Sequence, residues 1–575
     1  MNTIERYRSW LGSLYFDEAT KAELRAIAGD EKEIEDRFYR ELAFGTGGLR
    51  GVIGAGSNRM NIYTVRKATQ GLANFIIEEK GQEKGAAIAF DSRRMSPEFA
   101  MEAARVLCAN GIRTYLFESL RPTPELSFAL RTLGCIAGVV VTASHNPPEY
   151  NGYKVYWEDG AQITYPKDEQ IIERVNSITD YALVKTMDEA AARERGLLTI
   201  IGEEIDAKYM EELKKLVLNP QVIREQAKNM KIVYTPLHGT GNLPVRRVLA
   251  ELGFENVYVV PEQEKPDGDF PTVSYPNPED KKAFTFALEL AKKVDADLVL
   301  ATDPDADRLG VYAKDSKTGE YMAFTGNMSG MIICEYELSQ RKAKGLLPEN
   351  GAIVTTIVSG NMAQAAAEEY GAALIETLTG FKYIGEQIKF FEQGKKDHTF
   401  LFGFEESYGC LVGTHARDKD AVVAVMALCE AAAYYRSCNL TLWDQMQALF
   451  EKYGYYKEGL YTLTLKGAEG AQRIQHILKS FRSDPPKRIG AWRVEAIRDY
   501  SEDKLVDYRT GEEKTTGLPK SNVLYFELEE NAWCCVRPSG TEPKVKFYMG
   551  VKGSSLQDTD QKLEALTQAL TALIP

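Results

Sequence analysis

The sequence predicts an α/β protein with three similar domains on mostly parallel mixed sheets, followed by a C-terminal α+β domain. The first observation is the length of 575 residues, which suits about four domains at ~150 residues each. The second is an alternation of short β-rich apolar runs with amphipathic stretches, which occurs in three successive blocks. The third is a change after residue 452, where alternating strands precede a single helix.

The predicted elements follow a polar, helical N-terminus. The first block has strands at 86–90, 112–117 and 137–141 and helices at 97–110 and 124–132. The second has strands at 232–234, 257–260 and 298–300 and helices at 244–252 and 278–293. The third has strands at 353–357, 373–377 and 400–404 and helices at 362–370 and 383–392. The last has strands at 461–465, 523–528 and 544–549 and a helix at 556–573. These blocks correspond to domains 1–205, 206–322, 323–452 and 453–575.

Composition narrows the class of protein. The chain is 44% hydrophobic and 27% charged with a net charge of −13, which argues against broad binding to nucleic acid or to an anionic membrane. The longest apolar run, 421–435, contains Glu430 and is too short for a membrane span, so it predicts a buried helix. The first ten residues lack an apolar signal core, and the eight cysteines form no CxxC pair. We therefore expect a cytoplasmic protein with neither a membrane nor a nucleic-acid partner.

Three carboxylates follow the strand expected at 298–300. Asp303, Asp305 and Asp307 occupy alternate positions, so they can converge on one hard cation. An EF-hand loop is excluded, because its sixth and twelfth positions hold Arg308 and Lys314 here instead of glycine and glutamate. A solvated acidic turn is the alternative, but the spacing favours a Mg²⁺ site with open positions for a phosphate oxygen.

The segment TASHNP, residues 142–147, follows the strand expected at 137–141. Ser144 is therefore expected at the carboxyl end of a parallel sheet, where open α/β folds bind ligands. Adjacent side chains of an extended segment point apart, so His145 is expected to be a poor base for Ser144. A G-x-S-x-G elbow is absent. From these residues alone, a Ser/Asn/Pro turn without a catalytic role is an equal alternative.

Three further loops carry polar or cationic groups. The segment RPSGTEP, residues 537–543, offers the guanidinium, hydroxyls and glycine that a phosphate dianion requires, although a hairpin turn is an alternative. The segment GFEESYG, residues 403–409, offers carboxylates and a hydroxyl for vicinal sugar hydroxyls. The segment FGTGGLRG, residues 44–51, fits neither the dinucleotide nor the P-loop pattern and presents Arg50.

Together these segments resemble the α-D-phosphohexomutase family over nearly the whole chain. TASHNP, DPDADR, FEES and RPSGTEP match its serine, metal, sugar and phosphate loops in the family's order, and TPLHGTG (235–241) and TGFKYIGE (379–386) also match. The opening loop, the length and the EES sugar loop look most like a bacterial branch that acts on glucose and pentose phosphates. The resemblance implies four domains around a central cleft, the first three on a shared α/β plan.

The resemblance also implies a role for each matching residue. Ser144 would be a phosphoserine and would bind one Mg²⁺ per chain together with Asp303, Asp305 and Asp307. The other catalytic residues would be Arg50, His145, Lys154 and Lys419. The substrate-binding residues would be Thr379, Gly380, Lys382, Arg308, Glu405, Ser407, Arg537, Ser539, Gly540 and Thr541.

One position departs from the family's pattern. Phosphomannomutase-like members have a histidine four positions after the sugar-loop glutamate, where this chain has Gly409. The segment HARDKD, residues 415–420, resembles the glucose enzymes instead, in which a lysine of this loop approaches the substrate. Proton transfer is therefore assigned to Lys419, with His415 less favoured. Lys154 is a third candidate, because burial beside cations is expected to lower its pKa toward that of a base.

The expected reaction interconverts glucose 1-phosphate and glucose 6-phosphate, with glucose 1,6-bisphosphate as intermediate and activator. The alternatives are a phosphomannomutase or phosphopentomutase with the same mechanism, a metal-dependent phosphatase or kinase, and a sugar-phosphate binder without catalysis. The sugar and phosphate loops disfavour a phosphatase, because hydrolysis requires no reorientation of a bisphosphate. We further expect a monomer or homodimer whose acidic surface surrounds a positive cleft.

Overall fold

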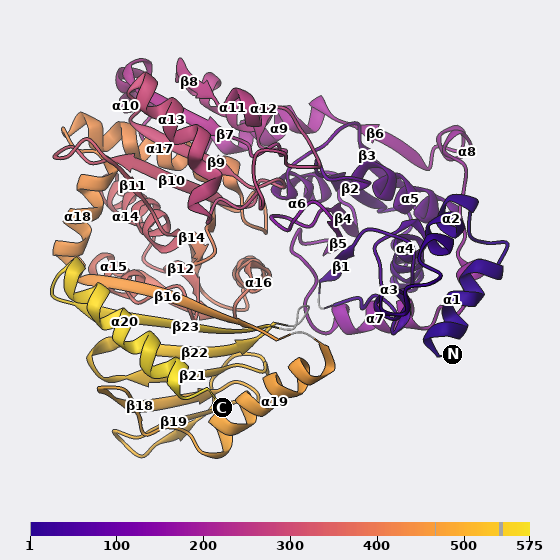
Figure 1. Ribbon diagram of the computed structural model, residues 1–575. Coiled ribbons are helices and arrows are strands. Elements are labelled where there is room, and N and C mark those ends of the chain that lie inside the picture. Colours follow the sequence, from indigo (N-terminus) through magenta and orange to yellow (C-terminus); the bar gives the residue numbers. More distant parts are fainter. Residues whose placement is uncertain (1, 46, 466, 540–543, 575) are drawn as a thin grey trace.

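Each of four successive stretches of the chain forms its own sheet (Figure 1). The structure, a computed structural model, describes residues 2–45, 47–465, 467–539 and 544–574. Three sheets mix parallel and antiparallel strands, and the fourth is antiparallel throughout its described pairs. The predicted fold class is therefore confirmed. The boundaries after residues 205, 322 and 452 stay predictions, and each lies inside an element, namely α9 (Glu203–Lys214), β11 (Tyr321–Ala323) and α18 (Leu442–Tyr453).

The first unit is a six-stranded sheet in the order β1-β5-β4-β2-β3-β6. Its strands are β1 (Gly48–Val52), β2 (Ala86–Phe90), β3 (Thr114–Phe117), β4 (Ala137–Val141), β5 (Tyr150–Trp157) and β6 (Leu198–Ile201). Its helices are α4 (Ile62–Glu78), α5 (Ser96–Ala109), α6 (Thr123–Thr132), α7 (Lys167–Asn176) and α8 (Glu189–Glu194). β2 and β4 are parallel and completely buried, which explains why both sequences are continuous apolar runs.

Three N-terminal helices cover one side of this unit (indigo in Figure 1). They are α1 (Thr3–Gly12), α2 (Glu18–Ala26) and α3 (Glu31–Phe38). An aromatic cluster joins them to α4: Trp10 stacks on Phe16 with ring centroids 4.0 Å apart and meets Tyr63 edge-on at 5.8 Å. The predicted helical N-terminus is thus confirmed as a packed layer.

The second unit is a five-stranded sheet in the order β11-β10-β9-β7-β8. Its strands are β7 (Lys231–Thr235), β8 (Asn256–Val259), β9 (Leu298–Thr302), β10 (Leu309–Lys314) and β11 (Tyr321–Ala323). Its helices are α9 (Glu203–Lys214), α10 (Pro220–Gln226), α11 (Asn242–Leu252), α12 (Pro261–Glu264) and α13 (Thr285–Val294). The helix predicted at 278–293 is wrong in its first half, because Asp280 caps a 3₁₀ turn over Lys281–Phe284 and the α-helix begins only at Thr285.

The third unit is a four-stranded sheet in the order β13-β12-β14-β15. Its strands are β12 (Gly351–Thr356), β13 (Ala373–Thr377), β14 (Thr399–Glu405) and β15 (Gly409–Val412). Its helices are α14 (Gly326–Ala343), α15 (Met362–Tyr370), α16 (Phe381–Glu392), α17 (Ala421–Ser437) and α18 (Leu442–Tyr453).

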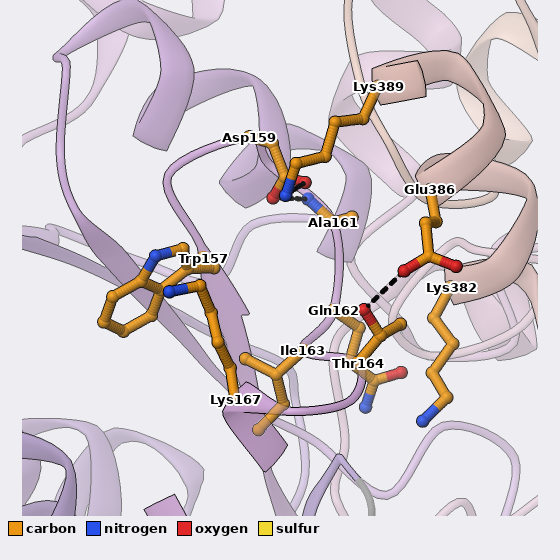
Figure 2. Close-up of a pocket in the computed structure, with 10 residues that line it drawn as sticks. All are labelled: Trp157, Asp159, Ala161, Gln162, Ile163, Thr164, Lys167, Lys382, Glu386 and Lys389. Carbon is orange, nitrogen blue, oxygen red and sulfur yellow. Dashed lines mark hydrogen bonds and ion pairs between the residues drawn. The ribbon is translucent and has the colours of Figure 1, made fainter. Parts of the chain in front are cut away.

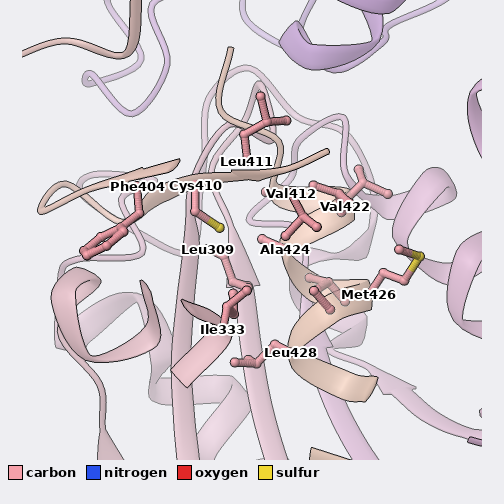
Figure 3. Packing of buried hydrophobic residues seen from close by; sticks show 14 of the residues in the cluster. Leu309, Ile333, Phe404, Cys410, Leu411, Val412, Val422, Ala424, Met426 and Leu428 are labelled. Carbon is pink, nitrogen blue, oxygen red and sulfur yellow. The ribbon is translucent and has the colours of Figure 1, made fainter. Parts of the chain in front are cut away.

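The helix α17 is shared between the second and third units. Its apolar side chains pack with β15, β10 and α14 (Figure 3), and it also contacts α10 and α11. Glu430 is buried in this helix and accepts hydrogen bonds from the backbone of Leu218, at 2.8 Å, and of Asn219. None of the described helices is long and apolar enough to cross a membrane by itself; α17 and α18 pass such a test only as a pair bent by 84°.

The C-terminal unit is an antiparallel sheet (orange to yellow in Figure 1). Its strands are β16 (Tyr455–Thr464), β17 (Arg488–Ile489), β18 (Trp492–Asp499), β19 (Lys504–Asp507), β20 (Glu513–Lys514), β21 (Leu524–Leu528), β22 (Trp533–Pro538) and β23 (Lys544–Gly553). α19 (Gly467–Ser483) and α20 (Leu556–Ala572) supply apolar side chains to one core. A second cluster joins Ile357 and Leu378 of the third unit to Tyr525 and Trp533.

Candidate active site

The predicted serine, metal and sugar loops all start at the carboxyl ends of central strands. Ser144 follows β4, Asp303 follows β9, and Glu405 is the last residue of β14. β4, β9 and β14 each pair in parallel with a neighbouring strand. The carboxyl edge of such a sheet is where backbone and side chains are free to bind a ligand.

The pairing of β1 with β5 brings two predicted cations to one face of the first sheet. Arg50 lies opposite Gly152, and Gly48 lies opposite Lys154. Because residues two apart on a strand share a face, Arg50 and Lys154 point to the same side. Arg50 also donates to Asn146 Oδ1 of the serine loop at 3.1 Å.

Ser144 has a left-handed backbone with φ of +50° and is 3% exposed. Its hydroxyl donates to Asp303 Oδ2 at 2.6 Å, and its Oγ lies 3.1 Å from His145 Nδ1. The expectation that the two neighbouring side chains point apart is therefore wrong, because it assumed an extended segment. Burial, assisted by Arg308 and Arg50, lowers the pKa of His145 well below its usual value, so this imidazole is neutral.

The three aspartates form the acidic cluster that the sequence predicts. Asp303, Asp305 and Asp307 are buried, with ligand oxygens within 4.8 Å of one another. Burial and the two neighbouring carboxylates raise the pKa of Asp303 well above its usual value. Asp305 Oδ1 and Asp307 Oδ1 are buried and accept no hydrogen bond from the described residues. Crowded carboxylates with unused oxygens fit a hard divalent cation.

Two lysines approach the acidic cluster from different units. Lys154 Nζ lies 2.7 Å from Asp305 Oδ2, and Lys419 Nζ lies 3.1 Å from Asp307 Oδ2. Burial would lower both lysine pKa values, but the surrounding carboxylates outweigh it and raise them. The hypothesis that Lys154 has a lowered pKa is therefore wrong, and both side chains are cations.

The sugar-loop residues lie beside Lys419. Ser407 donates to Glu405 Oε1 at 2.8 Å, and this oxygen lies 3.8 Å from Lys419 Nζ. His415, the less favoured proton carrier, instead pairs with Asp420 Oδ2 at 2.7 Å. His415 is thus paired with Asp420, whereas Lys419 contacts the acidic cluster.

The phosphate-loop cations come from the strands β22 and β23. Arg537 lies directly opposite Lys546 in the antiparallel register, an arrangement of like charges that is unfavourable without an anion. Burial and Arg537 lower the pKa of Lys546. The backbone of Ser539 donates to Lys544 O at 2.8 Å. The two other predicted phosphate-loop residues, Gly540 and Thr541, lie outside the described residues.

The TGFK segment opens α16 at the boundary between the first and third units. Gly380, with φ of +120°, precedes the helix, and Thr379 Oγ1 is buried without a hydrogen-bond partner among the described residues. Lys382 Nζ lies 3.9 Å from Asp168 Oδ2 and lines a small hollow between the two units (Figure 2). Two contacts bridge this hollow: Thr164 donates to Glu386 at 2.9 Å, and Lys389 pairs with Asp159 at 3.0 Å.

Several residues near the predicted loops were not predicted from the sequence. Thr123, at the start of α6, donates to Asp305 Oδ2 at 2.8 Å, and Glu279 pairs with the predicted Arg308. Arg93 and Asp91 lie beneath the serine loop. The sequence signal for Arg93 and Asp91 is an Asp-Ser-Arg segment after β2. This segment indicates no function until the fold places it beside Ser144.

Family models describe the same three α/β units. Models for domains I, II and III of phosphoglucomutase/phosphomannomutase, each described as alpha/beta/alpha, match residues 41–182, 207–318 and 325–453. The chain belongs to the phosphoglucomutase/phosphomannomutase family. The predicted resemblance to phosphohexomutases is thereby confirmed, and the protein is an enzyme of the phosphohexomutase type.

Individual relatives agree with this family. A phosphoglucomutase of Staphylococcus epidermidis is 36% identical over 92% of this chain and 94% of its own length. A phosphoglucomutase of Staphylococcus aureus is 34% identical over 96% of this chain and 98% of its own. The chain thus matches these members of the family over most of its length and of theirs.

Solved structures of the family share the fold at low identity. A putative phosphomannomutase from Thermus thermophilus has a TM-score of 0.69 at 21% identity, covering 93% of this chain and 99% of its own. The open form of the Paramecium phosphoglucomutase parafusin has a TM-score of 0.67 at 18% identity, covering 93% and 96%. Both support the arrangement of the sheets.

Proposed function

We propose that the protein is a phosphoglucomutase, which interconverts glucose 1-phosphate and glucose 6-phosphate through phosphorylated Ser144 and glucose 1,6-bisphosphate. The observation that carries the proposal is the convergence of three units on one point: Ser144 and Lys154 from the first, the aspartates from the second and Lys419 from the third. The two Staphylococcus relatives named above carry the same activity in their names.

The acidic cluster would hold one Mg²⁺. Asp303, Asp305 and Asp307 supply the carboxylates, and an oxygen on Ser144 completes the set proposed from the sequence. The cation would supply positive charge to the transferring phosphoryl group and to the serine oxygen. Thr123 and Lys154 hold Asp305 in place from the first unit.

The transfer itself exchanges one phosphorus–oxygen bond for another. The bond from phosphorus to Ser144 Oγ breaks as a sugar hydroxyl oxygen binds the phosphorus; the hydroxyl loses its proton, and Ser144 Oγ regains one. Lys154 and Lys419 act as fixed cations beside the phosphoryl oxygens, because nearby carboxylates keep them protonated. His145, neutral and 3.1 Å from Ser144 Oγ, accepts the proton that the sugar hydroxyl loses and returns it to Ser144 Oγ. The bisphosphate then turns around, and its other phosphoryl group returns to Ser144.

The remaining loops orient the sugar phosphate. Glu405 and Ser407 bind sugar hydroxyls, and Arg537 with the rest of the phosphate loop holds the phosphate that is not transferred. The like-charged pair of Arg537 and Lys546 supports this assignment, because an anion between them removes their repulsion. Arg50, Arg308, Thr379, Gly380 and Lys382 complete the proposed binding surface.

We place the reaction in the cytoplasm, without a nucleic-acid or membrane partner, and in a monomer or homodimer. The eight cysteines, all free thiols and seven of them buried, support a reducing compartment. The net charge of −13 supports the absence of polyanionic partners.

The decisive experiment compares sugar phosphates. The full chain is assayed with Mg²⁺ and trace glucose 1,6-bisphosphate on the 1-phosphates of glucose, mannose, ribose and glucosamine. We expect the highest kcat/KM for glucose 1-phosphate, with glucose 6-phosphate as product. A preference for mannose or ribose would redirect the proposal within the family, and stoichiometric release of inorganic phosphate would indicate a phosphatase instead.

The phosphoserine has a test of its own. Ser144→Ala removes the only atom that carries the phosphoryl group in this mechanism, so we expect loss of turnover and no phosphoenzyme by intact mass after incubation with glucose 1,6-bisphosphate. Ser177→Ala, at an exposed serine, is the control and is expected to behave as wild type. Turnover by Ser144→Ala at the wild-type rate would remove Ser144 from the reaction.

A further inference from the structure

A buried arginine lies directly beneath the loop that carries Ser144. Arg93 is in the segment between β2 and α5, and it is 1% exposed. A guanidinium stays charged at this depth, so its burial is strongly destabilising unless its N–H groups find acceptors. The partners of Arg93 therefore indicate what the residue is for.

Those partners are backbone carbonyls of the serine loop. Nη2 donates to the carbonyls of Ser144 and Asn146. Nη1 donates to the carbonyls of Pro147, at 2.9 Å, and of Tyr150, at 3.1 Å. One side chain thus binds four carbonyls within seven residues of chain, which fixes the path of this loop.

The loop needs such a support because its backbone is unusual. Ser144 has φ of +50°, a left-handed conformation that is unfavourable for a residue with a Cβ. Its carbonyl, one of the four bound by Arg93, is part of the peptide that sets the direction of the Ser144 side chain. A change in these bonds would move Oγ relative to Asp303, 2.6 Å away.

Arg93 is itself fixed from two sides. Asp91 Oδ2 lies 3.4 Å from its Nε, and Asp91 Oδ1 accepts from Ser96 Oγ at 2.7 Å. Phe270 of the second unit covers the guanidinium, with its ring centroid 4.9 Å from Arg93 Cζ. The loop that carries Phe270 comes close, since an added Cβ at Gly268 would lie 2.5 Å from Arg94 N.

We propose that Arg93 is a positioning residue for phosphoryl transfer, which holds Ser144 in line with the acidic cluster through four carbonyl bonds and which Phe270 fixes from the second unit. The proposal rests on the proposed function, since it concerns the position of Ser144 Oγ in that reaction. It assigns Arg93 no contact with the substrate. Lysine cannot replace it, because an ammonium lacks the planar fork that reaches four acceptors.

The test is Arg93→Lys in the full chain, with Arg66→Lys as the matched control. Arg66 is a partly buried arginine of the same unit, paired with Glu102 on the helix α5. We expect Arg93→Lys to lower kcat about a hundredfold, the effect of a misplacement near 1 Å, with an unchanged KM for the hexose phosphate. Its melting temperature should match that of Arg66→Lys, whose kcat should equal the wild-type value.

The outcomes separate the two proposals. Wild-type kcat in Arg93→Lys, or a rise in KM in place of the fall in kcat, would overturn the positioning role while the mutase assignment stands. A wild-type chain inactive on every sugar phosphate would overturn the proposed function and this inference with it. If Arg93→Lys melts far below Arg66→Lys, Phe270→Leu decides: a lower kcat at an unchanged KM and melting temperature supports the role, and wild-type kcat refutes it.

Discussion

Gly409 and Lys419 compete for the same space at the sugar loop. A Cβ added at Gly409 would lie 2.0 Å from Lys419 Cδ and 2.6 Å from its Cγ, distances that no real contact permits. A histidine at this position, as in phosphomannomutase-like members, and the lysine stem seen here therefore exclude each other. The glycine at position 409 is therefore required by the packing of the Lys419 side chain.

We therefore expect Gly409→Ala to impair catalysis by displacing Lys419. The methyl group would push Lys419 Nζ away from Asp307 and Glu405, and kcat should fall by up to about a hundredfold. Steady-state kinetics on glucose 1-phosphate measures the change. Gly29→Ala is the control, because an added Cβ there meets nothing within 4 Å. Equal kcat values for the two variants would contradict the coupling.

For single residues, the sequence predicts which side chains belong to the site better than it predicts their charges and contacts. Asp303, Asp305 and Asp307 are recognisable because their spacing after a strand is local information. The charge of Lys154 is not recognisable in the sequence, because it depends on Asp305, which is 151 residues away. The contact of Ser144 with His145 is not recognisable either, because it depends on the positive φ of Ser144. Arg93 was missed for the same reason, since its partners lie more than 50 residues away in sequence.

Among the elements, the N-terminal helices support the turn that follows β1. Glu23 accepts from the backbone of Ala55 at 3.1 Å, and Arg37 donates to the carbonyl of Ala55 at 3.1 Å. This turn continues from the strand that carries Arg50. The helices thus contribute to the site by holding the edge strand of the first sheet.

Loss of the aromatic cluster should loosen this layer. Trp10 is 3% exposed and contacts four other rings, so we expect Trp10→Ala to destabilise the first unit by about 3–5 kcal/mol. Hydrogen exchange of α1–α3 and thermal unfolding measure the effect. Leu14→Ala, at a side chain 96% exposed, should change stability by less than about 0.5 kcal/mol. Similar effects of the two substitutions would show that the cluster does not hold the layer.

Apolar strands with clear flanking turns are the elements that the sequence predicts best. The bounds of β2, β4, β13 and α15 are as predicted, because each is defined by an uninterrupted local pattern. The segment 278–293 is different. Its charged start, PEDKKAF, is compatible with an α-helix by propensity, and only the cap at Asp280 and the packing of Phe284 select the 3₁₀ turn.

In the whole molecule, the acidic cluster connects three units. Asp305 is held by Thr123 and Lys154 from the first unit, and Asp307 by Lys419 from the third. The C-terminal unit attaches to the third through Arg498 and Glu376, 2.9 Å apart. A ligand that binds the acidic cluster therefore stabilises the packing of three units that are separate in sequence.

Magnesium should raise the melting temperature of the full chain. A cation bound only to the folded state stabilises it by about 2.7 kcal/mol at a hundred times its Kd, and it also relieves the repulsion among the three carboxylates. We expect the rise in wild type and in the exposed control Asp484→Asn, and its loss in Asp305→Asn, by calorimetry with and without EDTA. An equal rise in all three proteins would place the magnesium elsewhere.

The helix α17 has a practical consequence for work on parts of this enzyme. It is buried on nearly every side, and its single acidic side chain, Glu430, binds backbone groups at the start of α10. A fragment cut between the second and third sheets would expose a continuous apolar stripe and leave a carboxylate without its donors. Such a fragment would aggregate, so the second and third sheets have to be expressed and labelled together.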